Sequence, residues 1–275
     1  MPHLWERVEE TVADLRDEGT VGVSLVGPDG DAWHQHGDRV FNAASTFKIA
    51  VMIAAYRQID AGQWSLHEPY TLVEADRTGG SGVLNHMQAG ATVTFHDLVY
   101  LMISISDNLA TDVLLTKVGI ANVNTTMTDL GMRHSRVDTT IRDMFASMRS
   151  SLAGAPIIPA TPDDYVAAIT AILDGRAASA DSCEAMQTML ATQQNHRRLA
   201  RYMPPLSPAI RFGSKTGTLR GVCNDVGFFA GPNGRLAIAV YTENFADTHV
   251  AEEAIGMIAR AAMADTGVVG PTYTS

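Results

Sequence analysis

Residues 41–62 read Phe41-Asn-Ala-Ala-Ser-Thr-Phe-Lys-Ile-Ala-Val-Met-Ile-Ala-Ala-Tyr-Arg-Gln-Ile-Asp-Ala-Gly62. The apolar residues that follow Lys48 predict a helix over about 46–60, and Gly62 is a typical helix stop. Strand-like patterns precede this stretch, whereas from about Ala44 to Leu199 the apolar spacing is mostly helical. The stretch therefore marks the change from predicted strands to predicted helices.

Upstream, the sequence predicts one amphipathic helix and a pair of strands. Leu4, Val8, Val12 and Leu15 fall on a single helical stripe. The strands are expected over 21–26 and 31–36, joined by a turn at 27–30 that contains Pro and two Gly.

Downstream, helices are followed by strands. The expected helices cover 46–60, 95–103, 108–117, 121–130, 162–174 and 183–192. Thr94 with Asp97, and Thr161 with Asp164, resemble capping boxes. Three strands are expected over 211–218, 225–230 and 235–241, and a last helix over 249–263, while 135–159 is the least regular stretch.

Strands at both ends and helices between them favour an α+β fold over a βαβ alternation. We expect an antiparallel sheet flanked by terminal helices, with an all-helical lobe inserted into it. The predicted division places residues 1–43 and 205–275 in the sheet lobe and 44–204 in the helical lobe, with an active site in the cleft between them.

Composition excludes several classes of protein. The chain has 275 residues, 46% of them hydrophobic, which is a globular balance, and 20 Lys plus Arg against 30 Asp plus Glu give a net charge of −10. The acidic balance argues against a nucleic-acid or membrane-surface binder. Cys183 and Cys223 are expected as free thiols, and without CxxC or HExxH we expect no metal. Acidic residues interrupt the N-terminal apolar pattern, so no signal peptide is predicted and the expected location is cytoplasmic.

The first chemical signal is Ser45-Thr-Phe-Lys48. Residues three apart on a helix are neighbours, so Lys48 is expected beside the Ser45 hydroxyl. Serine becomes a good nucleophile when a base takes its proton, and a lysine whose pKa is depressed by burial or by nearby cations can be that base. The helix start also offers backbone N–H groups for an oxyanion.

Two further signals follow in order. Ser106-Asp107-Asn108 succeeds the predicted helix over 95–103, and Lys215-Thr216-Gly217 lies in a late strand. Taken alone, the first pattern is also typical of a helix cap and the second of a strand end. Taken together with SxxK, they resemble the signatures of class A β-lactamases and penicillin-binding proteins.

The resemblance covers nearly the whole chain and implies a serine hydrolase of the β-lactamase/transpeptidase-like fold, without metal or organic cofactor. It makes Ser45 the acylated nucleophile, Lys48 its general base, and Ser106 the group that passes the proton to the leaving nitrogen. The implied substrate is a small molecule with an amide, ester or lactam carbonyl, and the oligomeric state is left open.

The resemblance also implies the remaining contacts. Asn108 would hold the substrate amide, Lys215 would lie near Ser106 and help to bind a carboxylate, and Thr216 and Thr218 would line the strand side. The backbone N–H groups of Ser45 and Thr218 would form the oxyanion hole, and Asp107 would have a structural role. Arg220 either adds to this anion site or is a solvated loop arginine.

The sequence departs from the family in the Ω-loop. Class A β-lactamases carry there a glutamate, in an ExxLN segment, that positions the deacylating water. No glutamate occurs between Arg133 and Thr161, and the expected position falls around Ile141 to Phe145. Asp143, the only carboxylate in that window, either replaces the glutamate or is an exposed loop residue; in the first case Asp143→Asn should slow turnover alone.

This departure leaves three activities open. The protein turns over β-lactams or other amides and esters, acylates once and stays acylated as a sensor, or transfers the acyl group to an acceptor. A glycine-rich segment, Gly79-Gly-Ser-Gly82, is a second departure; it is either a loop or a place where backbone approaches a ligand closely.

Overall fold

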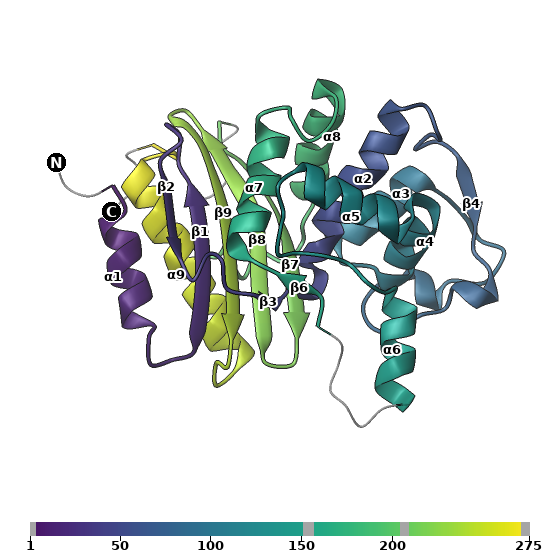
Figure 1. Ribbon diagram of the computed structural model, residues 1–275, viewed down its shortest axis with the longest axis horizontal. Coiled ribbons are helices and arrows are strands. Elements are labelled where there is room, and N and C mark those ends of the chain that lie inside the picture. Colours follow the sequence, from purple (N-terminus) through teal and green to yellow (C-terminus); the bar gives the residue numbers. More distant parts are fainter. Residues whose placement is uncertain (1–3, 151–156, 204–208, 271–275) are drawn as a thin grey trace.

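The computed structural model describes residues 4–150, 157–203 and 209–270. Its centre is a five-stranded antiparallel sheet in the order β2-β1-β9-β8-β7 (Figure 1). The strands are β1 Thr20–Val26, β2 Ala32–Gln35, β7 Arg211–Leu219, β8 Val222–Gly231 and β9 Gly234–Glu243. N-terminal and C-terminal strands thus share one sheet, as expected.

Alternation along the strands sends apolar side chains to both faces of the sheet. On β9, Leu236, Ile238 and Val240 face one hydrophobic cluster, whereas Ala237, Ala239 and Tyr241 belong to the other. A sheet buried on both faces needs a cover on each side.

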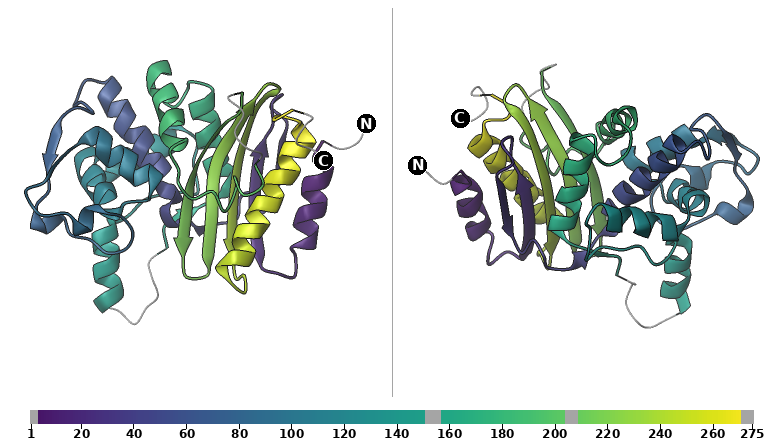
Figure 2. Two further views of the ribbon diagram at one scale, coloured as in Figure 1. Left: turned by 180° about the vertical axis from the view of Figure 1, so that it is seen from behind. Right: turned by 45° about the horizontal axis from the view of Figure 1, so that its top comes forward.

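The terminal helices cover one face. These are α1 Glu6–Asp14 and α9 Thr248–Thr266, which lie together on the same side of the sheet (Figures 1 and 2). On the other face, α7 Pro162–Leu173 packs against β1, β8 and β9. Pro162 at its first turn and the Thr161 side chain, which accepts from the Asp164 N–H, fix where α7 begins.

The helical part surrounds α2 Lys48–Asp60, whose residues 48–56 are all buried. A helix that is apolar all round requires neighbours on every side. The surrounding helices are α3 Phe95–Ser104, α4 Asn108–Val118, α5 Ile120–Asp129 and α8 Ala180–Leu190, and α6 Ile141–Ser150 lies at the edge, against α4. Small two-stranded sheets join β3 Phe41–Asn42 to β6 Pro159–Ala160, and β4 Pro69–Thr71 to β5 Thr92–Thr94.

The structure confirms the predicted fold class, an antiparallel sheet flanked by terminal helices, and corrects one detail. The stretch expected to be least regular contains α6, ten residues long. Although α7 falls within the predicted helical lobe, its apolar face packs on the sheet. No helix in the described ranges is long and apolar enough to cross a bilayer.

Candidate active site

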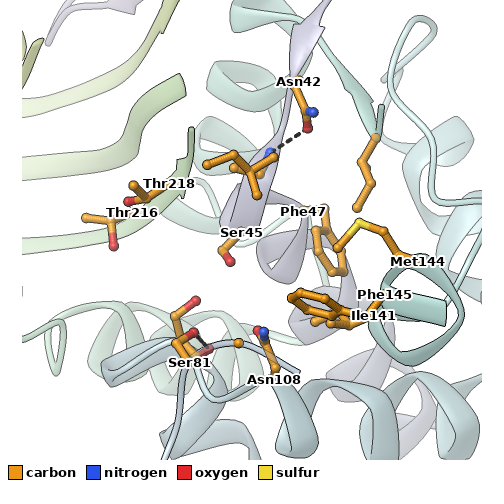
Figure 3. A pocket seen from close by; sticks show the side chains of 15 residues that line it. Asn42, Ser45, Phe47, Ser81, Asn108, Ile141, Met144, Phe145, Thr216 and Thr218 are labelled. Atoms are coloured by element: carbon orange, nitrogen blue, oxygen red, sulfur yellow. Dashed lines mark hydrogen bonds between the residues drawn. The ribbon is translucent and has the colours of Figure 1, made fainter. Parts of the chain in front are cut away.

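Ser45 lies in the short 3-10 helix Ala44–Phe47 that precedes α2. The preceding Ala44 has φ +46°, a left-handed conformation, and its N–H donates to the Asn42 side chain at 3.0 Å. Figure 3 shows the Ser45 side chain at the centre of a cavity, with Thr216 and Thr218 on one side and Phe47, Ile141 and Phe145 on another. The strained turn therefore presents the hydroxyl to the cavity.

Lys48 opens α2 and is fully buried. Its Nζ donates to the Ser106 carbonyl at 2.8 Å, the Ser106 Oγ at 3.0 Å and the Asn108 Oδ1 at 2.8 Å. Burial first, and then the charge of Lys215, hold the pKa of Lys48 well below its usual range. An amine with a lowered pKa can be neutral near neutral pH and can accept the proton of a serine.

Ser106 is held in a conformation that serine rarely adopts, with φ +61°. Its carbonyl accepts from Lys48 Nζ and from the Ser81 hydroxyl, both at 2.8 Å. The next residue, Asp107, caps α4 by accepting from the Ala110 N–H. Asp107 is thus structural, and the turn that it fixes carries the Ser106 hydroxyl toward Lys48.

The glycine-rich segment 79–82 lies against this turn. Asn108 Nδ2 donates to the Gly79 carbonyl at 2.9 Å, and a Cβ added to Gly80 would lie 2.2 Å from Asn108 Nδ2. A Cβ on Gly82, at φ +124°, would meet the Asp107 carboxylate at 2.3 Å. The glycines thus allow backbone to approach the Ser106–Asn108 turn closely. We call residues 79–82 the glycine strap.

The third group lies on β7. Lys215 is fully buried and donates to the Thr216 carbonyl at 2.7 Å. Burial lowers its pKa to about 7; Asp225 opposes this shift and Arg198 adds to it. Thr216 and Thr218 line the cavity. A Cβ on Gly217 would lie 2.7 Å from the Ala43 carbonyl, so glycine is needed for β7 to pass this close to the Ser45 turn.

The cavity has a volume of about 300 Å³ and two chemically different walls. Polar side chains come from the Ser106–Asn108 turn and β7, while α6 contributes Ile141, Met144 and Phe145. These three residues follow helical spacing and form an apolar wall on α6. No carboxylate lines the cavity within the described residues, and the undescribed segments contain no Asp or Glu.

A family model described as "Beta-lactamase enzyme family" matches residues 3–265. The chain belongs to that family. Because family and fold agree, this β-lactamase-family protein is a serine hydrolase of the class A type.

Three known proteins are similar to the chain to different degrees. It is 48% identical to the β-lactamase of Sphaerobacter thermophilus, with a TM-score of 0.91, covering 97% of this chain and 99% of that one. A penicillin G acyl-enzyme of a PBP-A mutant shares the fold, with a TM-score of 0.81 and 23% identity over 94% of each chain. A β-lactamase of Rhodobacter capsulatus is 31% identical over 117 residues, which span 42% of this chain and only 40% of that protein.

Two residues singled out from the sequence lie elsewhere in this β-lactamase-family protein. Asp143 is exposed on α6, does not line the cavity, and accepts from the Thr140 hydroxyl at 2.8 Å. Arg220 lies in the turn between β7 and β8 and lines a different cavity, against the start of α9. The predicted Ser45, Lys48, Ser106, Asn108, Thr216 and Thr218 are brought together, with Lys215 next to Thr216.

Sequence reasoning missed Arg198, which is buried beneath β7. Its guanidinium donates to the Thr218 Oγ1 at 2.6 Å and to the Gly217 carbonyl at 2.8 Å. A second carbonyl contact, to Asn224, and an ion pair with Glu252 at 3.4 Å complete its surroundings. Arg198 thus places a cation beneath β7, whereas Arg220 lies away from this cavity. No local pattern marks it, because its partners are distant in the sequence.

Asp112 was also missed. Its buried carboxylate accepts from the N–H groups of Ile141 at 2.7 Å and Arg142 at 2.8 Å. These are the first two residues of α6, so Asp112 fixes the start of the apolar wall. Desolvation raises the pKa of this carboxyl, against the hydrogen bonds that lower it.

Proposed function

We propose that this serine hydrolase forms an acyl ester on Ser45 with β-lactams and with related amides and esters, and that its β-lactam acyl-enzyme is hydrolysed slowly. The observation that carries the proposal is the contact of Lys48 Nζ with the Ser106 hydroxyl at 3.0 Å in the cavity that holds Ser45. The β-lactamase name of the 48% identical Sphaerobacter protein supports β-lactams as acyl donors.

In this mechanism, neutral Lys48 takes the proton of Ser45 while Oγ attacks the substrate carbonyl. The oxyanion lies toward the Ser45 and Thr218 N–H groups, a placement that the close approach of β7 to the Ser45 turn favours. Ser106 then donates its proton to the leaving atom and recovers one from Lys48 through their hydrogen bond. Asn108 and Thr216 orient the substrate.

Slow deacylation follows from the α6 wall. Water must be activated beside the ester carbon, yet α6 presents Ile141, Met144 and Phe145 there. Since a ring-opened β-lactam keeps its leaving group attached, the product fragment also stays in the way of water. An ordinary ester or amide loses its leaving group, which gives water or an acceptor access to the ester.

The test is intact-protein mass spectrometry after mixing with penicillin G, with the colour change of a chromogenic cephalosporin followed in parallel. We expect a mass increase equal to one penicillin that persists for minutes and is absent in Ser45→Ala. Ser65→Ala, a change at an exposed loop serine, is the matched control and should label normally. A labelled Ser45→Ala protein, or rapid colour without an adduct, would contradict the proposal.

The apolar α6 wall is also compatible with two other functions, a sensor that stays acylated and an acyltransferase. A sensor would release one equivalent of product and stop, whereas a transferase would form a product that depends on an added amine or alcohol. The expected cytoplasmic location stays a prediction.

A further inference from the structure

A fully buried asparagine on β8, Asn224, holds the turn that carries Ser45. Its Nδ2 donates to the Asn42 carbonyl at 2.8 Å and to the Ala43 carbonyl at 3.2 Å. Its Oδ1 accepts from the Thr242 N–H at 3.2 Å. Both N–H bonds and the oxygen of the side-chain amide are therefore engaged, which fixes the orientation of the amide.

The turn that Asn224 holds is strained. Ala44 has φ +46°, a left-handed conformation that alanine rarely adopts. Such a conformation persists only where the surrounding contacts impose it. The Asn42 side chain supplies one contact, by accepting from the Ala44 N–H, and Asn224 supplies two more on the carbonyls just before the strained residue. The Asn224 amide thus helps to fix the direction of the next N–H group, that of Ser45.

The backbone of Asn224 contacts the opposite wall of the oxyanion site. Asn224 pairs with Gly217 in the antiparallel ladder of β7 and β8, and the next residue on β7 is Thr218. Strand and turn approach closely at this point, because a Cβ on Gly217 would lie 3.0 Å from the Ser45 nitrogen. The Arg198 guanidinium strengthens the ladder here, since it donates to the carbonyls of both paired residues at 2.7 and 2.8 Å.

A second contact from the sheet holds the other end of the turn. Tyr241 is the β9 partner of Asn224 in the ladder, and its hydroxyl lies 2.9 Å from the Thr46 Oγ1. The turn is therefore attached to the sheet both before and after Ser45. In the sheet order, β8 lies between β9 and β7, so Tyr241 is not on a strand that pairs with β7. Of these two residues, Asn224 is the one that joins the turn directly to the partner strand of Thr218.

We propose that Asn224 is a positioning residue of the oxyanion hole, which sets the separation between the Ser45 and Thr218 N–H groups. This inference rests on the proposed acylation of Ser45. Oxyanion donors act only within hydrogen-bond distance of the developing charge, so a small shift of the turn removes much of their effect. Asn224 does not line the cavity, and it acts through the turn and β7 rather than on the substrate.

The ester carbonyl of the acyl-enzyme reports on the oxyanion hole directly. The protein is acylated with penicillin G that carries carbon-13 at the β-lactam carbonyl, and the ester stretch is isolated by difference infrared spectroscopy. Donors in the oxyanion hole polarise the carbonyl, so its frequency in the folded wild-type adduct should lie below that of the adduct unfolded in urea. In Asn224→Leu we expect most of this lowering to be lost and acylation to be about 10²-fold slower.

A matched control separates positioning from a merely structural role. Gln58, a half-buried amide on α2 that does not line the cavity, donates to the Val118 carbonyl and accepts from the Trp64 Nε1, both at 2.8 Å. Gln58→Leu and Asn224→Leu should both lower the stability of the protein. Only Asn224→Leu should also change the carbonyl frequency and the acylation rate.

A second variant guards against loss of folding in Asn224→Leu. Asn224→Ala leaves space in which water can bind the two carbonyls of the turn, and it has the same expected result. The wild-type frequency and rate in either folded variant would overturn this inference and leave the acylation of Ser45 intact. If mass spectrometry finds no penicillin adduct on the wild-type protein, the proposed function falls, and the positioning role of Asn224 with it.

Discussion

Two buried lysines lie close together in the site, and their neighbours give them different tasks. Lys48 contacts the Ser106 hydroxyl and carbonyl, and its pKa is lowered by burial and by Lys215. Lys215 contacts the Thr216 carbonyl, and Asp225 offsets part of its desolvation. Lys48 is thus suited to proton transfer, and Lys215 to positioning the strand and attracting an anion.

Replacing the base with a permanent cation separates these tasks. Lys48→Arg should slow acylation by penicillin G about 10²–10⁴-fold, because a guanidinium does not accept the Ser45 proton. The rate of adduct formation, measured by quenched mass spectrometry, checks this. Lys117→Arg, at the exposed end of α4, is the matched control and should acylate normally. Acylation of Lys48→Arg at the wild-type rate would remove Lys48 from the mechanism.

A carboxylate can be introduced into the α6 wall by substitution of Ile141. Ile141→Glu would bring an acid into the cavity, but Asp112 accepts from the N–H of the same residue. Two neighbouring buried acids cannot both ionise readily, so the double variant Ile141→Glu/Asp112→Asn is the better test. We expect its acyl-enzyme lifetime with penicillin G to shorten at least about tenfold. An unchanged lifetime would show that the apolar wall does not limit hydrolysis.

Asp143 provides the contrasting position on the same helix. Its carboxylate is exposed and bonded to Thr140, so Asp143→Asn should leave both acylation and turnover near the wild-type rates. Parallel measurement of adduct formation and adduct decay checks this. Slower decay of the adduct, with formation at the normal rate, would identify Asp143 as the base that activates the deacylating water.

At the scale of elements, the glycine strap and the Ser106–Asn108 turn act as one unit. Bonds from 79–82 reach Asn108 and Ser106, and the Asp107 carboxylate accepts from the Val83 and Leu84 N–H groups at 2.7 and 3.0 Å. A change in the strap is therefore transmitted to the catalytic turn.

Gly80→Ala tests this coupling. Gly80 has φ +88° and no room for a Cβ beside Asn108, whereas Gly90 has φ +92° and open space. Both alanine variants should lose about 1 kcal/mol of stability to backbone strain. Only Gly80→Ala should also slow acylation, by about tenfold or more, because Asn108 must move away from Lys48. Equal acylation rates in the two variants would contradict the coupling.

The elements also show where sequence reasoning succeeds. Strong periodicity and caps predicted α3, α4 and α7, and strand patterns predicted β8 and β9, since each is specified by its own residues. By contrast, α6 begins with N–H groups bound to Asp112, about thirty residues earlier in the chain. Arg198 likewise binds carbonyls of two later strands. Long-range contacts of this kind leave no local pattern.

For the molecule as a whole, burial of some ionisable groups makes stability rise with pH, and burial of others makes stability fall at high pH. Lys215 has a folded-state pKa of about 7, below its usual 10.5, so above pH 7 the unfolded chain holds a proton that the folded chain has lost. Stability then rises with pH. Cys223 and Tyr56 behave oppositely: burial raises their pKa values to about 11 and 12, so at high pH the unfolded chain ionises first and stability falls.

The free energy of unfolding should therefore rise from about pH 7 to about pH 10, because the unfolded lysines keep their protons over this range, and decline above it. Removing Lys215 isolates its share: Lys215→Met should flatten the rising limb by up to about 1.4 kcal/mol per pH unit, the value for one proton. Urea unfolding at half-unit pH intervals gives both curves, and the slope that remains in the variant reports Lys48, whose folded-state pKa is also lowered. Parallel curves for wild type and variant would mean that Lys215 stays protonated when buried. The lysine would then be a fixed cation of the anion site at every pH, and the rise in stability would have to come from Lys48 alone.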